Sequence, residues 1–209
     1  GIITAGGFLI QDVSRKGRTI HKSVYADLEW QFSPKFTLSF GGRLLKEDVE
    51  IRSSFDTNFP LFTPSSYKGT TENTVFVPKI GLHYDISDTQ KVSVTVNQGY
   101  RSGFVSNAGG AVTEVDPEFL TSTEIAYRAE DPDGFWRFGA TAFYSRYRDQ
   151  QVVVSLPGNQ VRTANAGKSE MFGLEIEGSH DFDNGFSVFG SLGFLKTRFI
   201  DFEDEGESF

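Results

Sequence analysis

Apolar and polar residues alternate with a period of two along residues 78–101. The odd positions are polar, charged or small, for example Lys79, His83 and Thr95. The even positions are mostly apolar: Ile80, Leu82, Tyr84, Ile86, Val92, Val94, Val96 and Tyr100. This period is that of a β-strand with one apolar and one polar face. The stretch predicts two long strands joined by a tight turn at 87–90.

The same alternation predicts strands along most of the chain, joined by connections of alternating length. The further extended segments are 1–12, 20–32, 36–48, 118–128, 135–148, 150–156, 161–179 and 186–200. Short turns are expected at 33–35, 87–90, 131–134 and 181–185. Longer connections are expected at 49–71, 102–117 and after 200. The loop at 13–18 and the turn at 157–159 fall at the same end of the strands as the longer connections. Short turns at one end and long loops at the other are typical of outer-membrane barrels. Greek-key sandwiches mix the two lengths.

Aromatic residues cluster where the apolar faces end. Trp136 and Tyr144 are eight positions apart, which is about 26 Å of strand and roughly 20 Å along the membrane normal at a tilt of about 40°. That height is close to the apolar band of an outer-membrane barrel. The predicted fold is therefore all-β, an antiparallel up-and-down membrane β-barrel with about nine or ten strands in this chain.

Composition narrows the function classes. The net charge is −8 and no basic patch is present, so nucleic acid is not an expected partner. A mean hydropathy of −0.30, with no run of 18 apolar residues, excludes a transmembrane helix but leaves a membrane barrel open. The absence of cysteine excludes disulfides and thiolate metal sites. No cofactor is expected.

Catalytic and metal-binding candidates are weak. His21, His83 and His180 are far apart in the sequence and lack metal-ligand spacing. Glu175 and Glu177 lie on one strand face about 7 Å apart. Carboxylates are also expected on a face that lines a water-filled barrel lumen, so this pair does not indicate catalysis. The acidic residues of 201–207 lack the calcium-loop register. We expect no enzyme activity and no bound metal.

Two other groups are candidate functional residues. Five charged side chains fall on polar strand faces, where they would line a lumen or contact a plug: Arg43, Glu124, Arg128, Glu175 and Glu177. The long loops 49–71 and 102–117 are the expected ligand-contacting segments, because loops on a rigid scaffold carry recognition. Their candidate ligand-binding residues are Phe59, Tyr67, Arg101 and Asn107.

Several local motifs, in this order, resemble the barrel of TonB-dependent outer-membrane receptors. They are Pro78-Lys79-Ile80-Gly81-Leu82-His83-Tyr84, then Gly99-Tyr100-Arg101-Ser102-Gly103-Phe104, Pro117-Glu118 with Glu124 and Arg128, Ala142-Phe143-Tyr144 with Tyr147, Asp149 and Gln151, and Asn165-Ala166-Gly167 with Gly173-Leu174-Glu175-Ile176-Glu177. The resemblance implies a barrel of roughly 22 strands closed by a plug domain. The plug and the segment that meets TonB are absent here, so the resemblance implies that residues 1–209 form a partial transmembrane barrel domain, a central part of a larger receptor.

The resemblance also implies a function. Such a receptor lies in the outer membrane of a Gram-negative bacterium, in contact with its lipid. It binds a small-molecule or metal-chelate ligand such as a ferric siderophore and takes it up through TonB, which meets the missing plug domain. Two other readings stay open: a passive pore or small structural outer-membrane barrel, and a soluble β-sandwich binding module. The sandwich predicts that the apolar faces lie in a protein core.

Overall fold

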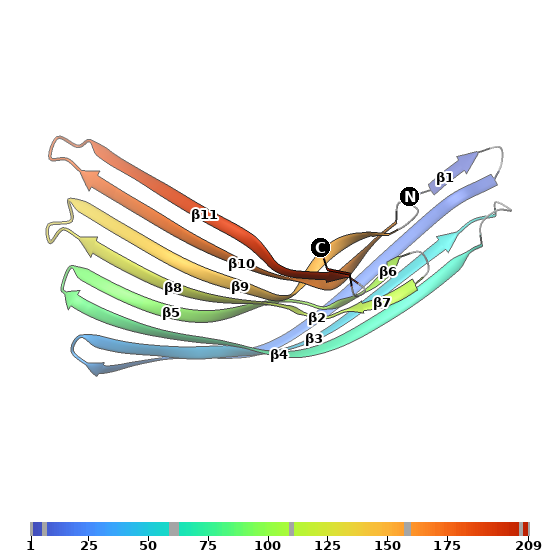
Figure 1. Ribbon diagram of the computed structural model, residues 1–209, viewed down its shortest axis with the longest axis horizontal. Helices are drawn as coiled ribbons and strands as arrows, with labels where there is room; N and C mark the ends of the chain where they lie inside the picture. The colour runs from blue at the N-terminus through green and yellow to red at the C-terminus, as the bar shows by residue number, and fades with distance from the viewer. Residues whose placement is uncertain are drawn as a thin grey trace.

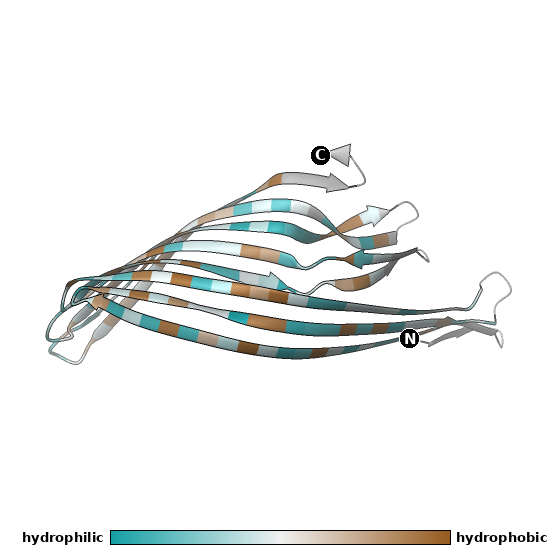
Figure 2. Ribbon diagram, turned by 90° about the horizontal axis from the view of Figure 1, so that it is seen from below, coloured by the Kyte–Doolittle hydropathy of each residue, from teal (hydrophilic) through white to brown (hydrophobic). Residues whose placement is uncertain are grey.

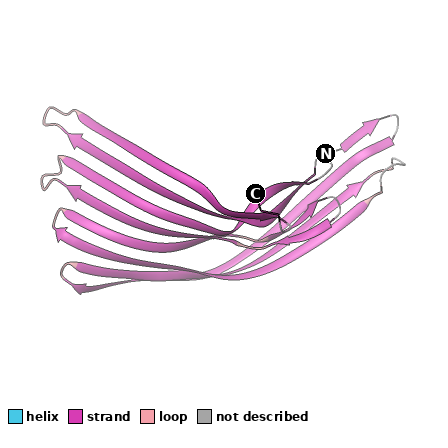
Figure 3. Ribbon diagram, in the orientation of Figure 1, coloured by secondary structure: helices cyan, strands magenta, loops and turns pink. Residues whose placement is uncertain are grey.

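The computed structural model describes residues 2–5, 8–58, 63–108, 111–156, 160–204 and 207–208. Within these ranges the only regular structure is β-strand (Figure 3). The strands are β1 (Ile2–Ala5), β2 (Phe8–Ser33), β3 (Phe36–Asp56), β4 (Ser65–Ser87), β5 (Gln90–Arg101), β6 (Phe104–Ala108), β7 (Ala111–Val115), β8 (Glu118–Glu130), β9 (Trp136–Leu156), β10 (Gln160–Asp181), β11 (Ser187–Asp204) and β12 (Glu207–Ser208). No helix in the described ranges is long and apolar enough to cross a membrane.

Ten of the described strands form one antiparallel sheet. Its order is β1-β2-β3-β4-β5-β8-β9-β10-β11-β12, and the separate pair β6–β7 is inserted between β5 and β8 (Figure 1). Apart from this insertion, each strand of the sheet pairs with the strands before and after it in the sequence, which confirms the up-and-down prediction and the expected number of strands. The described edge strands β1 and β12 do not pair with each other. The described residues therefore form an open sheet and no closed small barrel.

The short turns are where the sequence predicted them. The turns after β2, β4, β8 and β10 all lie at one end of the sheet (Figure 1). Gly134 and Gly185 have φ values of 81° and 82°, a region that glycine enters without a Cβ clash. Their amides donate to Asp131 O and Phe182 O, each at 2.9 Å. These two turns set the register of β8 with β9 and of β10 with β11.

The register aligns the apolar positions of successive strands into rows. Figure 2 shows the alternation of hydropathy along each strand. One row of directly opposed residues crosses eight strands: Trp30, Leu38, Leu82, Val94, Ile125, Ala142, Leu174 and Phe194. The neighbouring row on the opposite face contains Glu29, Ser39, Gly81, Thr95 and Glu124. We call these two sides the apolar face and the polar face.

The apolar face is not covered by a second layer in the described part of the chain. Val94 and Leu174 are each 38% exposed and Phe138 is 39% exposed. A β-sandwich would bury these three side chains in its core. The sandwich reading is therefore wrong for the described residues. An uncovered apolar face on a single sheet is the arrangement of a membrane barrel wall.

The strands extend further than the sequence predicted on the long-connection side. The expected loop 13–18 lies inside β2, and most of the expected loop 49–71 lies in β3, which ends at Asp56, and in β4, which begins at Ser65. The expected loop 102–117 contains the β6–β7 hairpin, and β11 continues to Asp204 in the acidic end. These predictions were wrong because polar residues in water still gain from ladder hydrogen bonds. The turn predicted at 157–159 lies outside the described residues.

Candidate functional site

The β6–β7 hairpin folds over the polar face of β3 and β4. Thr71 on the polar face of β4 donates a hydrogen bond from Oγ1 to Glu114 Oε1 on β7, at 3.1 Å. Gly69 lies beneath the hairpin, and a Cβ at this position would lie only 2.8 Å from the Val105 Cβ. Packing against this face buries Leu45, Val49, Val75, Val105 and Val115. The buried apolar core of the described residues is therefore mostly here, between the hairpin and the wall.

A buried carboxylate anchors the start of the hairpin to β3. Glu47 is 1% exposed, and its Oε2 accepts a hydrogen bond from Ser102 Oγ at 2.6 Å. The Tyr100 hydroxyl donates to the same oxygen, and His21 Nδ1 lies 3.7 Å from it. A buried charge costs free energy unless it is hydrogen-bonded, and these donors supply that compensation.

A second buried carboxylate, Glu118, joins the end of the hairpin to β9. Its Oε2 accepts from Arg101 Nη2 at 2.9 Å and from the Gln151 backbone amide at 2.7 Å. Arg101 Nη2 also donates to the Gln151 carbonyl at 3.1 Å. Charge-assisted bonds of this kind are roughly twice as strong as neutral ones. Arg101 and Glu118 thus fasten β5, β8 and β9 together below the hairpin.

Two amide side chains hold the ends of the hairpin segment. Gln151 Nε2 donates to the carbonyls of Ser102 and Asp116, at 2.8 and 2.9 Å. Asn165 Nδ2 donates to the carbonyls of Asp116 and Asp149, each at 2.8 Å, and Asn165 Oδ1 accepts from the Asp116 amide at 2.7 Å. We call the whole network the hairpin base: Glu47, Tyr100, Arg101, Ser102, Asp116, Glu118, Gln151 and Asn165. It fixes the hairpin over the polar face.

The hairpin base unites motifs that are separate in the sequence. The motifs at 99–104, 117–118, 149–151 and 165–167 come from four different parts of the chain and meet at this network. The spacing of these motifs in the sequence does not predict that they touch. Glu47 was missed entirely, because a single Glu on an alternating strand carries no local signal. Only its partners, 53 and 55 positions away in the sequence, reveal its role.

The five predicted charged residues all lie on the polar face. Glu124 stands opposite Thr95, Glu175 opposite Thr141, and Arg43 donates to Ser23 Oγ at 2.9 Å. Arg128 and Glu177 flank Gly139 in one row, at a hollow of about 680 Å³ near the short turns. The structure therefore groups Arg128 with Glu177, whereas Arg43 lies several strands away on β3. Contact with a plug remains a prediction.

The four loop candidates have different surroundings from those expected. Tyr67 lies in β4 and Asn107 lies in β6, so the placement of these two in loops was wrong. Arg101 ends β5, where the alternation predicted the strand to end. Phe59 lies outside the described residues. The Tyr67 hydroxyl is buried without a hydrogen-bond partner among the described residues, and burial raises its pKa. Among the described residues no group of His, Cys, Asp or Glu could hold a metal ion.

Comparisons with known proteins agree with this geometry. Residues 3–208 match the family model described as TonB dependent receptor-like, beta-barrel. The pesticin receptors of Yersinia enterocolitica and Yersinia pestis are 26% and 27% identical over 170 residues, which is 79% of this chain and 24% of each relative. The chain therefore spans about a quarter of the length of these relatives.

Solved structures share the fold. The ferric yersiniabactin uptake receptor FyuA from Yersinia pestis superposes with a TM-score of 0.79 at 19% identity, covering 95% of this chain and 30% of that one. The ferric-catecholate import receptor Fiu from K12 E. coli gives 0.71 at 18% identity, covering 93% and 30%. The matched family consists of outer-membrane transport proteins and not of enzymes. This chain belongs to the TonB-dependent receptor family, as part of its β-barrel.

Proposed function

We propose that this chain is part of the wall of an outer-membrane receptor that takes up a scarce, bulky solute by a TonB-dependent route. The solute class is a metal chelate such as a ferric siderophore. The observation that carries the proposal is the family match over residues 3–208. The solute class is supported by the names of similar structures, which describe uptake of ferric yersiniabactin and import of ferric catecholates.

The domain assignment is part of the same proposal. Residues 1–209 form a partial transmembrane barrel domain, and the plug and the segment that meets TonB lie outside these residues. The open sheet of the described residues supports this assignment. Outer-membrane lipid covers the apolar face. Five residues on the polar face line the lumen and contact the plug: Arg43, Glu124, Arg128, Glu175 and Glu177.

The hairpin base gives the ligand-contacting region its rigidity. It holds β6–β7 over the polar face on the side of the long connections. A preformed surface loses less conformational entropy when a ligand binds. We place solute contact on this side, with Phe59, Tyr67, Arg101 and Asn107 as the candidate ligand residues.

Radioactive iron uptake by the intact receptor tests the proposal. The receptor containing this segment is expressed in a host lacking its own siderophore receptors, with and without functional TonB. Iron-55 is offered as ferric yersiniabactin, a ferric catecholate or ferric alcaligin. We expect uptake of at least one chelate, and only in cells with TonB. Permeation of small solutes without TonB, with no chelate uptake, would favour the passive pore instead.

A further inference from the structure

Three basic side chains lie on the apolar face, at the level where its apolar band ends on the long-connection side. Arg146 stands opposite Glu170, which stands opposite Arg198, and Lys196 stands opposite Phe172. All three basic residues are exposed. At about 4.8 Å between strands and 3.3 Å per residue, they span roughly 10 Å. We call Arg146, Lys196 and Arg198 the basic patch.

The one acidic residue between them does not neutralise the patch. The Tyr144 hydroxyl donates to Glu170 Oε2 at 2.7 Å, and Arg198 Nε forms an ion pair with Glu170 Oε1. The Glu170 side chain is only 19% exposed, whereas that of Arg198 is 69% exposed. Arg146 and Lys196 form no ion pair within the described ranges. Arg148, two residues beyond Arg146 on the same face of β9, is also exposed. With it, four positive charges stand against one negative charge, which leaves three in excess.

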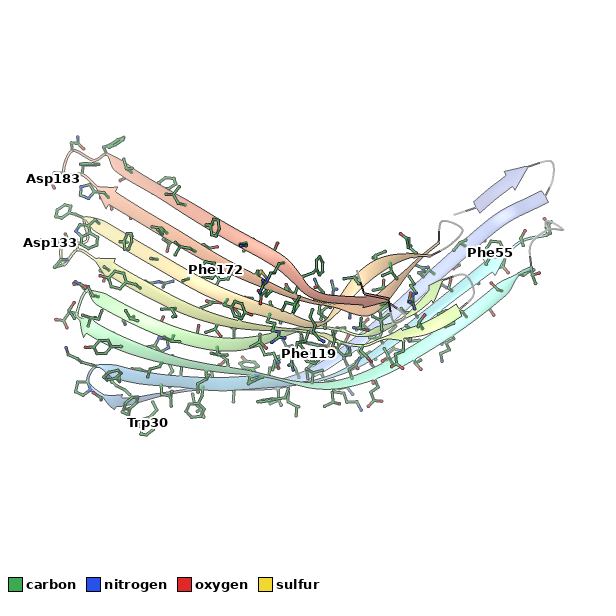
Figure 4. All side chains as sticks on the ribbon, in the orientation of Figure 1. Trp30, Phe55, Phe119, Asp133, Phe172 and Asp183 are labelled. Carbon is green, nitrogen blue, oxygen red and sulfur yellow. The ribbon has the colours of Figure 1, made fainter. Side chains whose placement is uncertain are left out.

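The surroundings of the patch are those of a membrane boundary. Directly below it on the same face lie exposed apolar side chains: Phe172, Leu174, Leu192 and Phe194. Figure 4 labels Phe172 on β10, with Asp183 at the short-turn end of the same hairpin. The short-turn end is acidic instead and carries Asp88, Asp131, Asp133, Asp181 and Asp183 against Lys35. The chain as a whole is acidic, with a net charge of −8. Its composition therefore does not explain why basic side chains group at one boundary of the apolar band.

We infer that the basic patch binds the phosphate of a lipid whose headgroup carries a phosphomonoester, with the acyl chains of that lipid on the apolar residues below. A phosphomonoester carries about −1.5 to −2 charge at neutral pH, which neutralises most of this excess. A phosphodiester headgroup carries less charge and would leave the patch partly unpaired. Arginine also binds phosphate oxygens in a bidentate manner. Tyr144 and Glu170 position Arg198 for that contact.

Native mass spectrometry of the intact receptor tests this inference. The receptor in neutral detergent is titrated with phosphatidic acid, a phosphomonoester lipid, with phosphatidylglycerol, a phosphodiester lipid, and with zwitterionic phosphatidylcholine. We expect the tightest binding for phosphatidic acid. A basic side chain beside an anionic headgroup contributes roughly fivefold in affinity. The combined change Arg146→Gln, Lys196→Gln and Arg198→Gln should therefore weaken binding about a hundredfold.

The matched control is a variant that removes three positive charges from the polar face. Lys79→Gln, Lys91→Gln and Arg137→Gln remove the same three charges from positions opposite Asn97, Arg128 and Ser179, and should leave lipid binding unchanged. Equal affinity of the two triple variants would overturn the inference. Equal affinity of the unchanged receptor for all three lipids would also overturn it, without requiring any variant to fold. Displacement of the lipid by inorganic phosphate would show a free-phosphate site and refute lipid docking.

Discussion

Phe143 is an aromatic residue on the polar face of the sheet, and a glycine makes room for it. Gly173 lies directly opposite Phe143, and a Cβ at Gly173 would overlap the Phe143 ring. The alternation of polar and apolar residues gives no partner for Phe143. The ring thus occupies the space that a side chain at position 173 would need.

We expect Gly173→Ala to destabilise the intact receptor by about 1–3 kcal/mol, the usual cost of overpacking. In a Phe143→Ala background the same change should cost much less, because the ring is gone. The urea midpoint of unfolding measures both effects. Gly178→Ala is the control on the same strand, since a Cβ there would lie 3.6 Å from the Arg137 carbonyl oxygen. Equal costs in the two backgrounds would show that Phe143 is not the obstacle.

Val94 and Thr95 are neighbours that point to opposite faces. Val94 stands between Leu82 and Ile125, and Thr95 stands opposite Gly81 and Glu124. Val94→Arg should cost about 2–4 kcal/mol near the bilayer midplane, because it places a charge in hydrocarbon. Thr95→Arg should be tolerated on the polar face. The heat-dependent gel shift of outer-membrane preparations measures the folded fraction of each variant. Similar losses of folded protein for both variants would contradict the lipid-facing assignment of Val94.

Side-chain direction could be predicted from the sequence, whereas polar partners could not. The period of two is a property of the strand backbone, so Val94 and Glu175 were assigned to the correct faces before any contact was known. The roles of Glu47 and Asn165 depend on partners about 50 positions away. No local pattern contains that information.

At the scale of elements, the β6–β7 hairpin was the largest surprise. The sequence predicted a loop at 102–117, because the segment is rich in glycine and lacks a long alternation. The hairpin is short, with five residues in each strand, and its stability comes from the hairpin base and from packing on β3 and β4. Two-stranded hairpins are marginal alone, which is why sequence propensity did not predict this one.

Weakening the hairpin base should release the hairpin without unfolding the wall. Glu118→Gln removes the charge that pairs with Arg101 and should cost about 1.5–3 kcal/mol, as for hydrogen bonds to charged groups. Hydrogen exchange followed by mass spectrometry should show faster exchange in 104–115, with β9 and β10 unchanged in their lower halves. Glu130→Gln, an exposed carboxylate at the other end of β8, is the control. Unchanged exchange in the Glu118 variant would mean that packing alone holds the hairpin.

At the scale of the molecule, the sheet has long edges. Residues 14–33 of β2 pair only with β3, and most of β11 pairs only with β10. Unpaired backbone groups in hydrocarbon cost several kcal/mol each, and free edges promote association between chains. The up-and-down order could be predicted because the turns after β2, β4, β8 and β10 are short. The strands that pair with the two sheet edges are not among the described residues.

We therefore expect that the isolated 209-residue chain, refolded in detergent, will not form a heat-modifiable monomer. Cross-linking and light scattering should report mixed oligomers. The intact receptor treated in the same way should give one monomeric, protease-resistant species. A monodisperse, protease-resistant monomer from the isolated chain would show that the sheet closes or protects its own edges.

The strands continue far above the apolar band, and this sets where capture begins. From Leu44, the last apolar residue of the band on β3, to Phe55 near the end of that strand there are 11 positions, or about 36 Å of strand and roughly 28 Å of height at a 40° tilt. This height is more than three Debye lengths at physiological ionic strength. Under the proposed uptake function, an arriving solute therefore meets the rim in open water, where the headgroup charges of the membrane are screened and cannot repel or guide it.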